Sequence, residues 1–162
     1  MAYSKILRRL RSEKTNYRKR KSMLMGKQNF ISVNITNENT QVQIMKPIIS
    51  GDHVMASAHS RFLIKNGWKG SRKSIPAAYL TGYLAGKKAI SSGTTNAILY
   101  SGTKKYTQRM AAALKGVIDS GVKVPANSET FPTEDRINGD HLKVKNDVSS
   151  MKTKIDSEAK AA

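Results

Sequence analysis

The sequence predicts an α/β fold, a small two-layer sandwich in which two main helices pack on a mixed, mostly antiparallel sheet of four strands. Three features lead to this prediction. Segments with alternating apolar and polar residues follow the N-terminal region, two helical patterns come later, and a short continuously apolar segment separates those helices. Alternation is typical of half-buried strands, whereas continuous apolarity is typical of a buried parallel strand. The folded domain is therefore expected over residues 29–124.

A basic arm precedes this domain over residues 1–28, which hold ten Lys or Arg residues and one acidic residue, hence a net charge of +9. Half of the chain's net charge of +18 lies in this segment. Because the arm has few apolar side chains to bury and its charges repel one another, we expect it to be extended until a polyanion orders it. Tyr17 lies within the run of cations, where its ring can stack on an unpaired base. A merely solvated charged face is the alternative.

Three alternating segments predict the first three strands. Ile31, Val33 and Ile35 lie on one face of the first strand, and Asn-Glu-Asn and Ser-Gly-Asp turns separate it from the next two. Short turns between alternating strands predict an antiparallel meander with one covered face. The strands are expected at Phe30–Thr36, Thr40–Lys46 and His53–Ala58.

A long helix is predicted over Ser74–Ser91, with Pro76 in its first turn. Its small residues Ala78, Gly82 and Gly86 recur every four positions and therefore share one stripe. Because glycine is less favourable than alanine in a helix by about 1 kcal/mol, something is expected to pack very close to this stripe. A sheet beneath the helix is the preferred interpretation, and the backbone of an RNA is the alternative.

The remaining elements of the domain are shorter or less regular. A short helix is expected over Arg61–Trp68 and ends at Gly67, and Ala97–Tyr100 is the continuously apolar strand. A second long helix is expected over Lys104–Ser120, because Gly121 is a typical C-terminal stop. The core stripe of this helix is predicted at Tyr106, Met110, Leu114, Val117 and Ile118.

The chain becomes more polar after Pro125. Residues 125–142 are expected to form a loop-like C-terminal extension with one helical turn near Thr133–Asn138. Residues 143–162 are nearly balanced in charge and show no apolar periodicity that would bury a face. We therefore expect this segment to be a polar tail that is mobile or ordered by a partner.

The composition restricts the class of partner. A pI near 10.3 indicates binding to nucleic acid or to an anionic membrane surface. A membrane is disfavoured, since no apolar run approaches the roughly 18 to 20 residues of a spanning helix and the arm lacks an apolar face. No apolar segment of a signal peptide follows the N-terminal charges, and the absence of cysteine excludes disulfides and thiolate metal sites. We expect a cytosolic protein.

Candidate catalytic groups are few. Gly82–Lys88 resembles a phosphate-binding loop only loosely, because it has three residues between its glycines and lies inside a helical pattern. His53, His59 and His141 do not have the spacing of metal ligands. Ser57 lies near His59, but no orienting acid is evident. We therefore expect no catalytic site, no metal, no cofactor and no enzyme.

Five stretches, in the same order, resemble one protein family. The arm contains Lys-Thr-Asn-Tyr, similar to the Lys-Thr-Asp-Tyr that ends the family's Arg-rich start, and four further motifs follow. The chain resembles the archaeal and eukaryotic type of universal large-subunit ribosomal protein eighteen, which binds 5S ribosomal RNA. The matching stretches are Arg9–Arg20, Gly51–Ser60, Pro76–Gly86, Ala112–Gly121 with Val124 and Pro125, and Arg136–His141.

This resemblance implies both a fold and a role. The fold is a mixed sheet with helices packed on it. The role is structural, in the cytoplasmic large ribosomal subunit, where the family attaches 5S rRNA to the large rRNA in the central protuberance beside ribosomal protein five. The partners are thus RNA and ribosomal proteins, with no membrane and no small-molecule substrate. Asn16 departs from the family's Asp, residues 29–46 match weakly, and the chain lacks the longer C-terminal region of eukaryotic members, which favours the archaeal type.

RNA-binding residues are expected chiefly in the arm, where Arg can form two parallel hydrogen bonds to one phosphate. Contacts from loops and polar strand residues are also expected, because RNA is recognised by shape, unpaired bases and 2′-hydroxyls. The predicted RNA-binding residues are Arg8, Arg9, Arg11, Lys14, Thr15, Asn16, Tyr17, Arg18, Lys19, Arg20, Lys21, Asn34, Ser57, His59, Arg72, Lys73, Lys104, Lys105, Tyr106, Arg136 and His141.

Several alternatives stay open at the level of sequence. A free-standing RNA chaperone or regulator of the same fold would exchange among many RNAs, and an enzyme acting on RNA would need a titratable cluster. Lys87 and Lys88 either face solvent or contact RNA. Trp68 is preferred as a core residue over a contact for RNA or protein.

Overall fold

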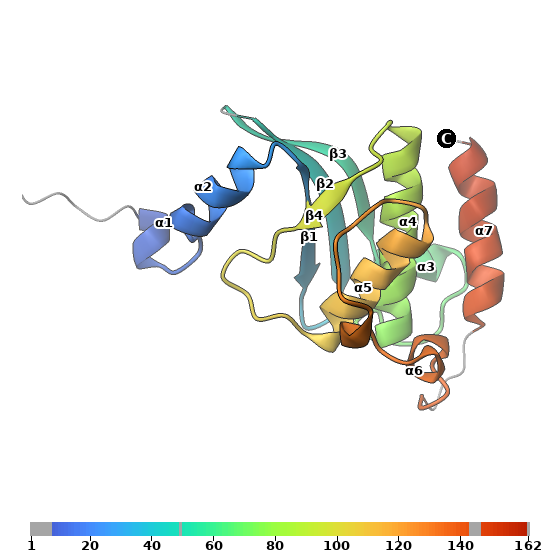
Figure 1. Ribbon diagram of the computed structural model, residues 1–162. Coiled ribbons are helices and arrows are strands. Elements are labelled where there is room, and N and C mark those ends of the chain that lie inside the picture. Colours follow the sequence, from blue (N-terminus) through green and yellow to red (C-terminus); the bar gives the residue numbers. More distant parts are fainter. Residues whose placement is uncertain (1–7, 49, 143–146, 162) are drawn as a thin grey trace, which may run out of the picture.

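The computed structural model describes residues 8–48, 50–142 and 147–161. A single four-stranded sheet lies at its centre. Its strand order is β3-β2-β1-β4; β2 pairs antiparallel with both neighbours, and β4 pairs parallel with β1 (Figure 1). The predicted fold class, a mixed and mostly antiparallel sheet of four strands with two main helices packed on it, is confirmed. The strands are β1 (Asn29–Ile35), β2 (Thr40–Ile48), β3 (Gly51–His59) and β4 (Ala97–Leu99).

Helices lie on both sides of this sheet. Figure 1 shows α4 and α5 against one face, α7 on the far side of α4, and the helices of the arm on the opposite side of the sheet. Residues 1–7 of the predicted arm and residues 143–146 and 162 of the predicted tail lie outside the described residues. The helices are α1 (Arg8–Arg11), α2 (Tyr17–Met25), α3 (Arg61–Lys65), α4 (Ile75–Ser91), α5 (Gln108–Asp119), α6 (Glu134–Asn138) and α7 (Val148–Ala161).

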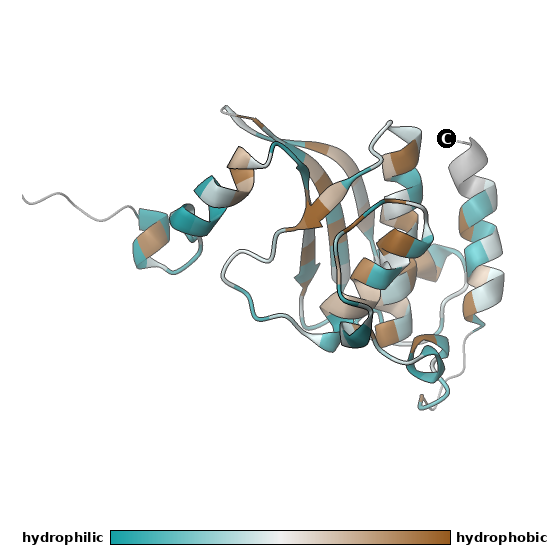
Figure 2. Ribbon diagram, viewed as in Figure 1, coloured by the Kyte–Doolittle hydropathy of each residue, from teal (hydrophilic) through white to brown (hydrophobic). Residues whose placement is uncertain are grey.

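The core lies between the sheet and the helix pair α4–α5. Ile31 and Val33 of β1 and Val42 and Ile44 of β2 are all buried, as the alternation predicts. Burial of each such side chain contributes roughly 1.5–3 kcal/mol to the free energy of folding. Apolar residues also gather on the helices that face the sheet, whereas the arm is mostly hydrophilic (Figure 2). Trp68 is buried, which confirms its expected place in the core. The strand β4 lies at the edge of the sheet, so only its first residue is fully buried.

The glycine stripe of α4 packs against α5. A Cβ atom on Gly82 would lie 2.0 Å from the carbonyl oxygen of Ala113, and one on Gly86 would lie 1.8 Å from the Oγ of Ser120. From the other helix, a Cβ on Gly116 would lie 2.1 Å from the carbonyl oxygen of Tyr79. Both sequence interpretations of the stripe, a sheet and an RNA backbone, are therefore wrong. The small residues let two helices approach backbone to backbone.

The second long helix begins later than the sequence suggests. The Oγ1 of Thr107 accepts a hydrogen bond from the Met110 amide at 3.4 Å, so Thr107 is the N-cap and α5 starts after it. Lys104, Lys105 and Tyr106 consequently lie in the loop before α5. Tyr106 is 44% exposed and does not belong to the core stripe, which corrects its predicted place.

The predicted polar tail contains a helix that packs on α4. Val148, Met151 and Ile155 of α7 are buried and belong to the hydrophobic core. Their spacing of three and four residues places them on one helical face. The prediction that residues 143–162 lack an apolar face is thus wrong for residues 148–155. The apolar residues were too few to recognise without the surface of α4 that they cover.

Polar contacts complete the attachment of α7 to α4. Asp156 accepts a hydrogen bond from the Tyr83 hydroxyl at 3.0 Å and forms an ion pair with Lys87 at 2.9 Å. The ammonium group of Lys152 lies 4.7 Å from the ring centroid of Tyr79 and 5.8 Å from that of Tyr83. The sequence left open whether Lys87 faces solvent or contacts RNA; in the structure it contacts α7.

The arm contains helices α1 and α2 where an extended chain was predicted. The Oδ1 of Asn16 accepts a hydrogen bond from the Lys19 amide at 3.0 Å and caps α2. Lys and Arg are good helix formers, so a cap is enough to favour a helical turn over an extended chain. Neither helix buries a residue, so the expectation that a polyanion orders the arm stays a prediction.

Candidate nucleic-acid interface

A basic cleft of about 430 Å³ lies between the arm, the outer face of the sheet and the loop that follows β4. Its lining includes four cationic and two aromatic side chains together with one carboxylate, Asp52. Cations attract a phosphate backbone, and aromatic rings can stack on unpaired bases. The cationic and aromatic residues are Arg9, Lys14, Arg20 and Lys104, and Tyr17 and Tyr100.

Hydrogen bonds within the arm shape one wall of this cleft. The Nε of Arg9 donates to the Oγ1 of Thr15 at 3.0 Å, and Thr15 is buried. Asn16 caps α2, so the side chains of Thr15 and Asn16 hold the bend between α1 and α2. The Nζ of Lys19 donates to the Oγ of Ser101 at 3.4 Å and ties α2 to the loop after β4.

Arg20 has different surroundings from the other cations of the arm. Its guanidinium lies 5.8 Å from the ring centroid of Phe30 and 5.5 Å from that of Tyr100, and these two rings stack at 5.4 Å. It also donates a hydrogen bond to the carboxylate of Asp52. The side chains of Arg20 and Asp52 are only 22% and 23% exposed. The hydrogen bond to Asp52 raises the pKa of Arg20 above its ordinary value.

The outer face of the sheet continues the cleft with uncharged polar groups. Strand pairing aligns Asn34 with Gln41 and His59 in one row and places Ser57 in the next row on the same face. The Nζ of Lys104 donates to the Oδ1 of Asn34 and joins this face to the loop before α5. Amide and hydroxyl groups suit 2′-hydroxyls and base edges, so this surface complements the cations beside it.

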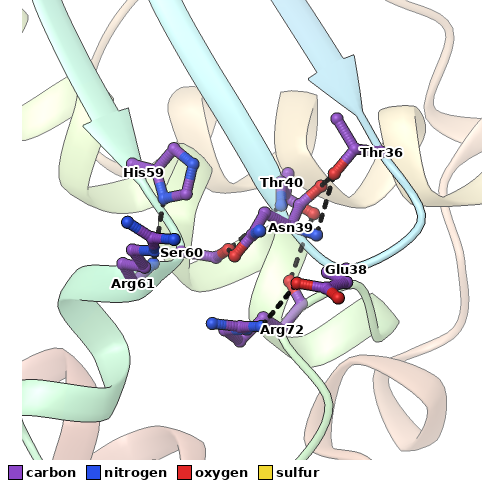
Figure 3. Close-up of polar contacts among 8 residues, drawn as sticks. All are labelled: Thr36, Glu38, Asn39, Thr40, His59, Ser60, Arg61 and Arg72. Carbon is purple, nitrogen blue, oxygen red and sulfur yellow. Dashed lines mark hydrogen bonds and ion pairs between the residues drawn. The ribbon is translucent and has the colours of Figure 1, made fainter.

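His59 and its neighbours hold the far end of the sheet together. The Nδ1 of His59 accepts a hydrogen bond from the Arg61 amide at 3.1 Å, which requires that nitrogen to be unprotonated (Figure 3). The buried Oγ of Ser60 accepts from the Thr40 amide at 3.0 Å. Arg72 forms an ion pair of 3.1 Å with Glu38 on the turn between β1 and β2. These contacts organise local structure and supply no acid that would orient His59 as a base.

Several predicted RNA-binding residues lie away from the basic cleft. Arg72, Lys73, Arg136 and His141 do not line it, and the Nη1 of Arg136 donates to the Oε1 of Gln108 at 3.0 Å. Lys105 lines a neighbouring cleft of about 630 Å³ that shares Lys104 with the first. The exposed arm residues Arg8, Arg11, Arg18 and Lys21 and the exposed ring of Tyr106 line neither cleft.

Comparison with known proteins identifies the family. The family described as ribosomal large subunit proteins 60S L5, and 50S L18, matches residues 2–111. The chain belongs to this family. Three similar relatives are the large ribosomal subunit proteins uL18 of Thermofilum pendens, Aeropyrum pernix and Korarchaeum cryptofilum. They are 42%, 43% and 44% identical to this chain over 86% of its length, and the match covers 72%, 67% and 73% of the respective relative.

Membership of this family gives the chain a structural role in the large ribosomal subunit. The family resemblance read from the sequence motifs, and the archaeal type that it favours, are thereby confirmed. Among the described residues, no helix is both long and apolar enough to cross a membrane. No group of three or more His, Asp or Glu side chains in this part of the chain is arranged to hold a metal ion.

Sequence reasoning missed two residues at the basic cleft and one at the neighbouring cleft. Tyr100 was assigned only as the end of a strand, although its ring lies at the cleft. Asp52 was read as part of a turn, yet it is the partner of Arg20. Arg109 lines the neighbouring cleft from the first turn of α5, and its exposed place near a helix N-terminus gave no signal of its own. The roles of Tyr100 and Asp52 depend on the approach of the arm to the sheet, which no local pattern encodes.

Proposed function

We propose that this chain binds 5S rRNA and attaches it to the large rRNA in the central protuberance of the cytoplasmic large ribosomal subunit. The observation that supports this most directly is the basic cleft, where cations of the arm and Lys104 converge beside an uncharged polar sheet face. Such an arrangement can bind phosphates on one side and ribose or base edges on the other. Ribosomal protein five is the proposed neighbouring protein.

The protein acts in this proposal by binding alone and catalyses no reaction. The phosphate contacts come from arm residues such as Arg11, Lys14 and Arg18, whose side chains are exposed and accessible to a phosphate. Tyr17 is 39% exposed at the cleft and is the proposed stacking residue. Asn34, Ser57 and His59 supply neutral hydrogen-bonding groups on the sheet.

The first test is binding of the purified protein to 5S rRNA and to transfer RNA across a salt series. Two cleft lysines are changed together, Lys14→Gln with Lys104→Gln. Each lost phosphate contact should lower the slope of log affinity against log salt by about 0.7–0.9, so the double variant should lose roughly 1.5. The matched control changes Lys65→Gln with Lys123→Gln, which removes the same charge from exposed positions outside the basic cleft.

Each outcome of this test bears on the proposal. Tighter binding to 5S rRNA than to transfer RNA, with a reduced slope only in the cleft variant, supports a specific ribosomal contact. Equal affinity for both RNAs would instead favour a free-standing RNA chaperone. Equal slopes for the cleft and control variants would show that the charge acts through the whole surface and not through the cleft.

A further inference from the structure

Arg20 and Asp52 form a contact that a simple phosphate-binding arm does not explain. The guanidinium of Arg20 already has a carboxylate partner and lies near two aromatic rings, Phe30 and Tyr100. A phosphate that approached Arg20 would have to displace Asp52 from a side chain that is only 22% exposed. The remaining described Lys and Arg residues of the arm are exposed and accessible to phosphates.

Asp52 itself is unfavourable for RNA binding if only its charge is considered. Among the described residues, it is the one carboxylate in the lining of the basic cleft, where it lowers the positive potential that attracts phosphates. A negative charge in such a position weakens the binding of RNA, so its presence suggests a separate, structural role. Its contact with Arg20 supplies that role, because it joins β3 to α2 across the cleft.

Phe30 gives independent support for a joint at this point. Its neighbours in the sequence, Asn29 and Ile31, point to the opposite face of the sheet, so Phe30 belongs to the outer face. Phe30 is nevertheless completely buried, with the ring of Tyr100 stacked on it and Arg20 beside both rings. Removal of α2 would expose the rings of Phe30 and Tyr100 on the outer face of the sheet.

We propose that Arg20, Asp52, Phe30 and Tyr100 form a joint that sets the direction of the arm over the sheet. Arg20 is then a positioning residue for RNA binding and not a phosphate contact, an inference that rests on the proposed function. The joint holds α2 against the sheet, so that Arg9 and Lys14 face the same cleft as Lys104. Its partner surface is within this chain, and RNA binds the cleft that it organises.

The substitution Asp52→Asn distinguishes the joint from a purely electrostatic role, because the two predict opposite changes in RNA affinity. Asp52→Asn removes a negative charge from the basic cleft, which should strengthen RNA binding if Arg20 is simply freed for a phosphate. If the joint positions the arm, the same change should weaken binding to 5S rRNA about five- to tenfold, because a hydrogen bond between charged groups is lost. The matched control Glu13→Gln removes an equal charge from an exposed position in the arm and should leave affinity unchanged or raise it.

A double-variant cycle separates the joint from general effects of charge. In an Arg20→Ala background, Asp52→Asn should no longer weaken binding, since the contact is already absent. Arg20→Lys retains the charge but not the planar group that lies beside the rings, so it should also weaken binding. The matched control Lys65→Arg, at an exposed position outside the basic cleft, should leave binding unchanged. The salt slope should change little in Asp52→Asn, because no phosphate contact is removed.

A measurement on the free protein makes the two proposals separable. Protons on the Arg20 side chain should be shifted upfield in NMR spectra by the rings of Phe30 and Tyr100, and Asp52→Asn should reduce that shift. If the wild type fails to prefer 5S rRNA while this shift is present and lost in the variant, the proposed function fails and the joint stands. If the wild type binds 5S rRNA and Asp52→Asn binds equally well or better, the joint is overturned as a positioning device.

Discussion

At the scale of single residues, two tyrosines on successive turns of α4 connect three helices. The hydroxyl of Tyr79 donates to the Oδ2 of Asp119 on α5 at 2.6 Å, and that of Tyr83 donates to Asp156 on α7. Burial raises the pKa of Tyr79 well above its ordinary value, and the hydrogen bond to Asp119 raises it further. Tyr79 is therefore both a core side chain and the polar connection between α4 and α5.

Replacement of this tyrosine, Tyr79→Phe, should lower the free energy of unfolding by about 1–2 kcal/mol at neutral pH, because one hydrogen bond to a charged group is lost. The effect should also depend on pH. The folded pKa lies above the ordinary value of 10.0, so this contribution is complete below pH 10.0 and is lost as the pH rises beyond it, when the unfolded state releases its proton first.

Urea unfolding, followed by the fluorescence of Trp68, measures both effects, since Trp68 is the single tryptophan and is buried. The difference in stability between wild type and Tyr79→Phe should be constant below about pH 10 and should shrink as the pH rises above that value. Other titrating groups are common to both proteins and cancel in this difference. A difference that stays constant over the whole range would show that Tyr79 titrates alike in both states.

At the scale of elements, the contact between α4 and α5 depends on the absence of side chains. Gly82 and Gly86 of α4 and Gly116 of α5 all lie where a Cβ atom would meet the other helix within 2.1 Å. Such close approach lets backbone atoms of the two helices contact directly. It has a cost, because each glycine is less favourable in a helix than alanine by about 1 kcal/mol. The pair then covers the sheet as one layer.

The substitution Gly116→Ala should destabilise the protein by about 2 kcal/mol or more, although alanine is the better helix former. The new methyl group would meet backbone atoms of Tyr79 and Tyr83, which cannot turn away as a flexible side chain can. The matched control is Gly26→Ala at the end of α2, where φ is −73° and the nearest atom is at 3.4 Å. Thermal or urea unfolding of both variants checks the prediction, and similar effects at the two positions would contradict it.

The elements that sequence predicted well are those whose pattern is local. The alternation in β1, β2 and β3 and the cap at Ser74 of α4 were evident without knowledge of any partner. The helix α7 was missed because its apolar face consists of only three residues, whose burial depends on contact with α4. The start of α5 was predicted too early, because Tyr106 fits the helical period. The N-cap of the helix is Thr107, so Tyr106 belongs to the loop before it.

At the scale of the whole molecule, the chain combines a well-packed domain with an arm that has little apolar contact. All but five residues of α4 are buried, whereas α1 and α2 bury none. The cleft lies at the boundary between these parts, so its shape depends on how the arm is held. Composition predicts that the arm binds a polyanion, and this stays a prediction. It gave no indication that Asp52 and Tyr100 would line the same cleft, because their approach is set by tertiary structure.

Amide hydrogen exchange of the free protein should therefore reveal two levels of protection. Amides of α4 should exchange only on global unfolding, whereas those of residues 8–25 should exchange nearly as fast as in an unstructured chain. A helix as short as α2 is marginal by itself in water, and a joint made by the side chain of Arg20 orients the arm without stabilising each of its amides. Addition of 5S rRNA should slow exchange in residues 8–25 and leave α4 unchanged. Protection of residues 8–25 equal to that of α4 before RNA is added would show that the arm is already folded, and RNA would then bind a preformed surface instead of ordering one.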